Sequence, residues 1–236
     1  MPRRSLSPLL KSLLPRACVL VGAPVLGLIL AGVPAASAGV TQAHAPRLAA
    51  ENGYTDTNSA GNTYHEVSAT WTQPAITCGA STTVVSFWVG IDGYTSATVE
   101  QAGTEVECDS GKATYFSWWE MYPGAPQVVG TTVKSGDKIT ASVTKSGSSK
   151  YTLAVTDATH TADSFTVTQT CAPTTCLDSS AEWIEQPAGS PAVAAWTVKG
   201  ATVKSGSVTG VISTFPYVVL GTAGPLNAAG NGFTVP

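Results

Sequence analysis

From Tyr54 onward the chain consists of short runs of alternating apolar and polar residues, and this alternation restricts its fold more than any other feature. The runs are rich in Thr, Val and Ser, and pairs such as Asp92-Gly93, Ser110-Gly111 and Ser146-Gly147 separate them. A period of two residues with frequent turn residues is typical of antiparallel strands. After residue 38 no segment keeps a helical period. We therefore expect an all-β chain in which two antiparallel sheets form a β-sandwich of the concanavalin A-like or jelly-roll type.

The first 38 residues have the three parts of a secretory signal peptide. Four basic residues lie among the first 16, an apolar run covers Cys18–Val33, and Ala36–Ala38 forms a small-residue cleavage site. The apolar run is too short, and too closely followed by that site, to favour a membrane anchor. We therefore expect residues 1–38 to be removed from a secreted, extracellular protein. Residues 39–50 should form a loose segment or a short propeptide, and residues 51–236 a single domain.

Removal of that signal would change the net charge of the chain. The formal net charge at pH 7 is −3 for the whole sequence, but all 15 acids and only 8 of the 12 Lys and Arg follow residue 38, which leaves −7. An acidic chain repels phosphate groups, so we expect neither nucleic acid nor an anionic membrane surface as a partner.

Four cysteines remain after the signal, and an even number in an exported chain predicts disulfides. Cys171 and Cys176 are five residues apart and can close a small loop. Cys78 and Cys108 would then join the strands on either side of Trp88. We expect no metal site, because the chain has no C-x-x-C pair and no histidine near either cysteine pair.

Four segments carry the strongest functional signal. They read F-W-V-G-I-D-G, V-E-Q-A-G-T, W-W-E-M-Y-P and A-E-W-I-E-Q-P, at Phe87–Gly93, Val99–Thr104, Trp118–Pro123 and Ala181–Pro187. As a set they resemble the secreted glutamic peptidases, or eqolisins, over roughly residues 52–235. The resemblance implies an acid endopeptidase on a β-sandwich that hydrolyses polypeptides without a metal or organic cofactor. We expect it to act as a monomer.

The resemblance also assigns two catalytic roles. The family's E-Q-x-G glutamine matches Gln101, whose amide can donate to an oxyanion without changing its charge at low pH. The catalytic glutamate belongs to the segment that reads A-E-W-I-E-Q-P, which is one residue shorter here than the family pattern. An ungapped alignment places Gln186 at the catalytic position, whereas deletion of one residue places Glu185 there. We therefore expect Glu185 to be the general base and acid, with Glu182 as the alternative.

The same resemblance implies that Trp88, Asp92 and Glu120 line the cleft and support the catalytic pair. Strand alternation places Trp88 and Asp92 on the face of their strand opposite to its core residues, and we expect that face to be an open groove. Acids that lie close together cannot all ionise. Asp92 and Glu120 are therefore expected to hold protons at acid pH.

Two other functions suit a secreted all-β chain with several tryptophans. A β-sandwich glycosidase would use two carboxylates, for example Glu120 and Glu185. A catalytically inactive module that binds glycans or proteins would use Trp88, Trp118 or Trp119 as a stacking platform. Neither function needs a glutamine between the two acidic segments, which favours the peptidase.

Histidine-based hydrolases are not expected. The chain has only His44, His65 and His160, and no G-x-S-x-G or H-E-x-x-H motif accompanies any of them. Serine hydrolases and zinc hydrolases depend on such motifs.

Overall fold

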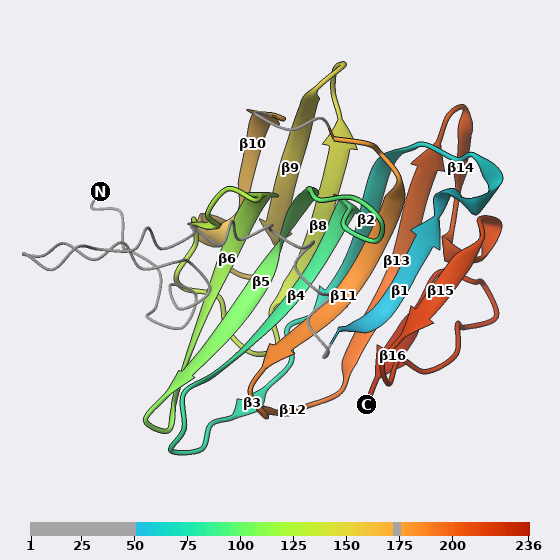
Figure 1. Cartoon of the computed structure of the whole chain (residues 1–236). Helices are drawn as coiled ribbons and strands as arrows, with labels where there is room; N and C mark the ends of the chain where they lie inside the picture. Colours follow the sequence, from blue (N-terminus) through green and yellow to red (C-terminus); the bar gives the residue numbers. More distant parts are fainter. Residues whose placement is uncertain (1–50, 172–175) are drawn as a thin grey trace, which may run out of the picture.

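The computed structural model describes residues 51–171 and 176–236, and strands make up nearly all of the regular structure in these ranges. Two large antiparallel sheets stack face to face (Figure 1). This arrangement confirms the all-β sandwich that the alternating sequence predicts.

Each of the two large sheets has seven strands, and we call them sheet A and sheet B. In spatial order, sheet A consists of β15 (Tyr217–Leu220), β1 (Asn52–Thr57), β11 (Ser180–Ala188), β4 (Thr83–Asp92), β5 (Val99–Asp109), β6 (Lys112–Tyr122) and β7 (Gln127–Val128). Sheet B consists of β10 (Phe165–Thr170), β9 (Lys150–Asp157), β8 (Lys138–Lys145), β2 (Tyr64–Thr72), β13 (Trp196–Ser205) and β14 (Val208–Gly210), with β16 (Phe233–Val235) paired to β13. A small third sheet pairs β3 (Ile76–Thr77) with β12 (Ala192–Val193). Three short 3₁₀ turns complete the description, namely η1 (Asn58–Ala60), η2 (Thr161–Asp163) and η3 (Ile212–Thr214).

Sheet A carries apolar side chains on both of its faces. The inner face of β4 packs into the core between the sheets through Val85, Phe87, Val89 and Ile91, as the alternation predicts. Trp88 points the other way and belongs to a smaller cluster on the outer face, together with Phe116, Trp118 and Ile184. Side chains alternate along a strand, so Trp119 packs against the main core while Trp118 lies outside.

Trp196 on β13 links the two sheets through aromatic contacts. Its ring lies 5.8 Å from that of Trp71 on β2, 5.5 Å from that of Phe87 on β4 and 5.7 Å from that of Phe233 on β16, between ring centroids. Large aromatic side chains contribute strongly to core packing. These contacts therefore fix β4 of sheet A against sheet B.

Both predicted disulfides are present. Cys78–Cys108 joins the segment before β4 to the end of β5, and Cys171–Cys176 closes a short loop between β10 and β11. A disulfide stabilises chiefly by restricting the unfolded chain, and more so for a longer loop. The first bridge spans 30 residues and the second only five, so the first should contribute more to stability.

The expected signal peptide and the segment 39–50 lie outside the described residues. Within the described ranges, no helix has the length and apolar character needed to cross a membrane.

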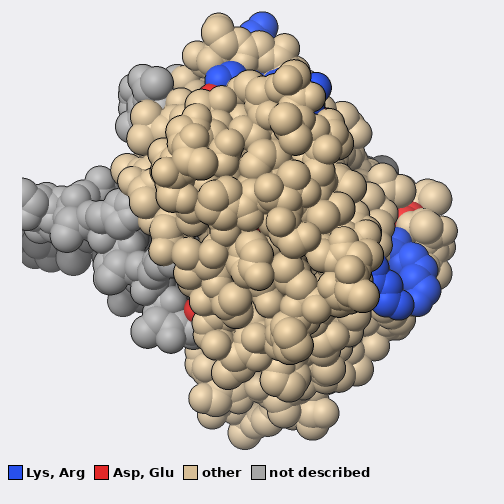
Figure 2. All heavy atoms as spheres, turned by 90° about the vertical axis from the view of Figure 1, so that its right-hand side faces the viewer, with Lys and Arg blue, Asp and Glu red and all other residues tan. Residues whose placement is uncertain are grey.

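Charged side chains are sparse on the face shown in Figure 2. Charged residues form only 11% of the sequence, and ten of the 15 acids are buried.

Candidate active site

Four residues from four adjacent strands of sheet A form one row across the sheet. Directly opposite residues in paired antiparallel strands have their side chains on the same face. The pairings of β11 with β4, β4 with β5 and β5 with β6 align Glu182, Gly90, Gln101 and Glu120. We call these four residues the Glu182–Glu120 row. Because Gly90 is two positions from Trp88 on β4, the row lies on the outer face of sheet A.

Glu120 holds the amide of Gln101. Nε2 of Gln101 donates to Oε2 of Glu120 across 2.6 Å. Oε1 of Gln101 is buried and has no hydrogen-bond partner among the described residues. Burial raises the pKa of Glu120 to about 8, although the hydrogen bond from Gln101 acts to lower it. Glu120 is therefore neutral in acid, and the second N–H of Gln101 is not used by this bond.

Glu182 lies across Gly90 from Gln101, and it is only 3% exposed. Adjacent strands are about 4.8 Å apart, so the Cα atoms of Glu182 and Gln101 are separated by about 10 Å. Ser180 Oγ donates to Oε1 of Glu182 across 3.4 Å. A Cβ atom at Gly93 would lie 2.8 Å from Oε2 of Glu182, so the glycine makes room for the carboxylate.

Glu185 does not lie next to Gln101, contrary to the sequence-based expectation. It pairs with Phe87, which belongs to the core between the sheets. The pairing of β11 with β4 is continuous from Ala181 to Ala188, so no bulge reverses the face. Glu185 therefore lies on the core side of sheet A, where burial raises its pKa to about 7.

Asp92 is a second correction, because it does not line the outer face. It ends β4 with a φ of 67° and is fully buried. Its carboxylate accepts hydrogen bonds of 2.8 to 3.1 Å from the backbone N–H groups of Leu177, Asp178 and Ser179, and from Oγ of Ser179. Asp92 therefore fixes the segment that leads into β11, the strand that carries Glu182.

The outer face of sheet A around Trp88 is largely buried. Ser86, Trp88 and Gln101 are each exposed by 8% or less. Nε1 of Trp88 donates to Oε1 of Gln186 across 3.2 Å, and a Cβ atom at Gly90 would lie 3.0 Å from the Trp88 ring. Trp88 therefore forms a wall beside the Glu182–Glu120 row.

A model of the Peptidase A4 family matches residues 50–198, a range that contains the whole Glu182–Glu120 row. The chain belongs to this peptidase family. It is a glutamic-type endopeptidase, and its substrates are polypeptides. A comparison with curated protein sequences found no significant match.

Solved structures of glutamic peptidases share the fold. Scytalido-glutamic peptidase with a transition state analog inhibitor is 21% identical, with a TM-score of 0.64 over 79% of this chain and 97% of that chain. SCP-B, an eqolisin in complex with the tripeptide Ala-Ile-His, is 19% identical, with a TM-score of 0.60 over 79% and 97%. Aspergilloglutamic peptidase from Aspergillus niger is 26% identical, with a TM-score of 0.52 over 64% and 96%.

The peptidase has a further acid on this face that its sequence motifs do not single out. Glu105 follows Gln101 by four residues on β5, and it accepts a hydrogen bond of 2.6 Å from Oγ of Ser86. Burial raises the pKa of Glu105 to about 7, and its charge in turn raises the pKa of Glu120. The period of two residues along β5 is the sequence signal that could have identified it.

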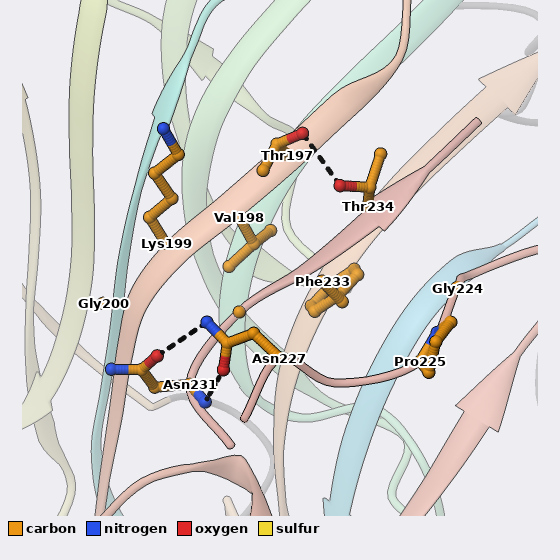
Figure 3. Close-up of a pocket in the computed structure, with 11 residues that line it drawn as sticks. Thr197, Val198, Lys199, Gly200, Gly224, Pro225, Asn227, Asn231, Phe233 and Thr234 are labelled. Carbon is orange, nitrogen blue, oxygen red and sulfur yellow. Dashed lines mark hydrogen bonds between the residues drawn. The ribbon is translucent and has the colours of Figure 1, made fainter. Parts of the chain in front are cut away.

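The pocket in Figure 3 lies away from this row, between β13 and the chain that leads into β16. It has a volume of about 560 Å³. Its polar side chains bond mainly to one another, since Asn227 Nδ2 donates to Asn231 Oδ1 across 3.0 Å and the hydroxyls of Thr197 and Thr234 are 2.9 Å apart. None of the predicted site residues lines this pocket.

Proposed function

We propose that this peptidase is a secreted acid endopeptidase in which Glu182 is the general base and acid and Gln101 stabilises the oxyanion. The Glu182–Glu120 row carries the proposal, because it sets the two side chains on one face with a glycine between them. Two disulfides and the N-terminal signal pattern support secretion. In this proposal residues 51–236 act as one monomeric domain.

The first step takes place beside Gly90, between the side chains of Glu182 and Gln101. A water molecule placed there can donate one hydrogen to the ionised carboxylate of Glu182 and the other to Oε1 of Gln101, which has no other partner among the described residues. Glu182 takes a proton from this water as its oxygen forms a bond to the carbonyl carbon of the substrate. The electron pair of the carbonyl moves to its oxygen, and Nε2 of Gln101 donates to the resulting oxyanion.

The second step breaks the peptide bond. The oxyanion re-forms the carbonyl, the C–N bond breaks, and protonated Glu182 gives its proton to the leaving amine. The products are a carboxylic acid and an amine, and Glu182 returns to its ionised form. One carboxyl group can therefore act as base and then as acid.

Glu120 positions the amide and links activity to acid pH. Its hydrogen bond directs Nε2 of Gln101, and its pKa of about 8 keeps it neutral in acid. An ionised Glu120 would place a negative charge beside the forming oxyanion. The proposed mechanism therefore requires a pH below the pKa of Glu120.

The two alternative functions have less support from the geometry. A glycosidase that used Glu120 and Glu185 would need both acids at one site, but they lie on opposite faces of sheet A. A binding module would need an accessible aromatic platform, but Trp88 and Trp118 are exposed by only 3% and 5%, and the partly buried Trp119 packs against the core between the sheets.

Digestion of denatured casein tests the proposed function directly. We expect internal cleavage of casein by the secreted form in acid, with loss of activity as the pH rises through about 8. Mass spectrometry of the products identifies the cut bonds, and a polysaccharide digest run in parallel serves as the comparison. Cleavage of the polysaccharide alone would favour the glycosidase, and cleavage of neither substrate would favour the binding module.

Gly90→Val should lower kcat/KM by about 100-fold, because its side chain would displace the Trp88 ring and stand between Glu182 and Gln101, where the proposed water and scissile carbonyl bind. The backbone of Gly90 does not have a positive φ, but a Cβ atom there would lie 3.0 Å from the Trp88 ring and 3.2 Å from the backbone oxygen of Glu100, so the melting temperature must show that the variant is folded. Gly79→Val is the matched control, since a Cβ atom there meets nothing within 4 Å. Peptide hydrolysis rates and melting temperatures are measured for both variants. Full activity in folded Gly90→Val would show that the reaction does not take place beside Gly90.

A further inference from the structure

A second cluster of ionisable side chains lies at one end of sheet B, apart from the Glu182–Glu120 row. Asp137 directly precedes β8, Asp157 ends β9 and His160 directly precedes η2. One ligand atom from each of these three residues lies within 4.8 Å of the other two. We call these residues the Asp–Asp–His cluster.

Both aspartates are buried, and one oxygen of Asp157 has no hydrogen-bond partner among the described residues. Asp157 is fully buried, and its Oδ1 accepts hydrogen bonds from the backbone N–H groups of Thr159 (2.7 Å) and His160 (2.8 Å). Oδ2 of Asp157 is also buried but has no hydrogen-bond partner among the described residues. Because Oδ1 of Asp157 bonds to the turn after β9, Oδ2 is the oxygen that is available to a ligand shared with Asp137 and His160. A buried, unpartnered carboxylate oxygen is costly unless a proton or a cation satisfies it.

The third residue gives the cluster an imidazole and access to solvent. Nδ1 of His160 lies 2.8 Å from Oδ2 of Asp137, which also accepts a hydrogen bond of 2.7 Å from the backbone N–H of Lys134. The side chain of His160 is 32% exposed, whereas that of Asp137 is only 4% exposed. In the described part of the chain, no Lys or Arg side chain forms an ion pair with either aspartate of the cluster.

We propose that the Asp–Asp–His cluster binds a divalent cation of the zinc class through Asp137, Asp157 Oδ2 and His160 Nδ1. One imidazole nitrogen and two carboxylate oxygens suit Zn²⁺, and a water molecule entering beside the exposed histidine completes four ligands. Ligand atoms about 2.1 Å from a tetrahedral zinc ion are about 3.4 Å apart, so small side-chain rotations bring the three atoms to that spacing. The ion takes the position between Nδ1 of His160 and Oδ2 of Asp137, which are 2.8 Å apart without it.

The bound ion has a structural role in this proposal. The turn after His160 contains Asp163, whose backbone oxygen accepts a hydrogen bond of 2.7 Å from Oγ of Ser117 on β6. The carboxylate of Asp163 also accepts hydrogen bonds from the N–H and Oγ1 of Thr132. A cation that fixes His160 therefore stabilises a link between the end of sheet B and sheet A. This role does not depend on the catalytic proposal.

Zinc titration of the full chain after chelator treatment tests the site. At pH 7 we expect one Zn²⁺ per chain by isothermal titration calorimetry, a higher melting temperature in excess zinc, and a visible absorption band when Co²⁺ replaces zinc. Asp157→Asn keeps the oxygen that accepts from the backbone and removes only the second carboxylate oxygen. Both Asp157→Asn and His160→Gln should weaken zinc affinity at least about tenfold, whereas His65→Gln should not change it.

Two results would overturn the assignment. One is the absence of zinc binding up to millimolar zinc concentration. If Asp157→Asn then also raises the melting temperature without metal, the two aspartates share a proton and the cluster is not a metal site. The other is zinc binding that both cluster variants leave unchanged. If Asp157→Asn does not fold, the partly exposed His160→Gln decides between these outcomes alone.

Discussion

Glu182→Gln is expected to lower kcat/KM for a peptide substrate by at least about 1,000-fold while leaving the protein folded. Glutamine preserves the size and hydrogen-bonding reach of the side chain, but it cannot take a proton from water and return it to the leaving amine. Proton transfer by a positioned group contributes about 10²- to 10⁴-fold to a rate. Initial rates with an internally quenched peptide in acid, together with the melting temperature of each variant, measure the effect.

Glu185→Gln is the matched control, because it makes the same substitution on the same strand but on the opposite face. We expect it to keep its activity within about threefold of the wild type. Gln101→Ala should lose about 10²- to 10³-fold, the loss that follows removal of one oxyanion donor. An inactive Glu185→Gln beside a fully active Glu182→Gln would refute the catalytic role of Glu182. It would favour the alignment of A-E-W-I-E-Q-P that places Glu185 at the catalytic position.

The protein should be most stable in acid, with a melting temperature that falls by more than about 10 °C between pH 4 and pH 8.5. Burial raises the pKa of six carboxyl groups: that of Asp157, and those of Asp56 and Glu100 to about 9, Glu120 to about 8, and Glu105 and Glu185 to about 7. In the unfolded chain these groups titrate near pH 4. Between pH 4 and 9 the folded state therefore binds more protons than the unfolded state, so the free energy of unfolding falls as the pH rises.

Asp56→Asn isolates one of these groups. Both carboxylate oxygens of Asp56 are buried without a partner among the described residues, and asparagine resembles the protonated acid in shape. The variant should lose less stability than the wild type between pH 4 and pH 8.5. Asp109→Asn changes an exposed acid and should follow the wild-type curve. Calorimetry at constant ionic strength gives these curves, and a wild-type melting temperature that is constant or rises with pH would contradict the explanation.

The comparison of Glu182 with Glu185 shows where sequence information ends. The segment A-E-W-I-E-Q-P is one residue shorter than the family pattern, so it can be aligned in two ways. The segment itself does not show at which position the residue is missing. The structure keeps β11 regular beside β4, so the residue opposite Gly90 is Glu182. That register depends on core contacts made by Trp183 and on the anchoring of the preceding loop by Asp92, both of which involve residues distant in the sequence.

Asp92 shows the same limit in another way. Strand alternation places its side chain on the outer face, but a φ of 67° at the end of β4 turns it toward three backbone N–H groups near residue 178. A local period of two residues holds only while the backbone stays extended. The sequence does not predict the Asp–Asp–His cluster either, because only the pairing of β8 with β9 brings Asp137 and Asp157 together.

The sequence alone determined the β-sandwich, the inner face of β4, the two disulfides and the candidacy of Gln101, since each rests on a local period, a cysteine count or a contiguous motif. Only the tertiary structure decided which glutamate faces Gln101, that Glu120 holds its amide, and that Asp92 anchors the loop before β11. The physical reason is that the face and the neighbours of a side chain depend on strand register and backbone turns. Packing between distant segments sets both of these.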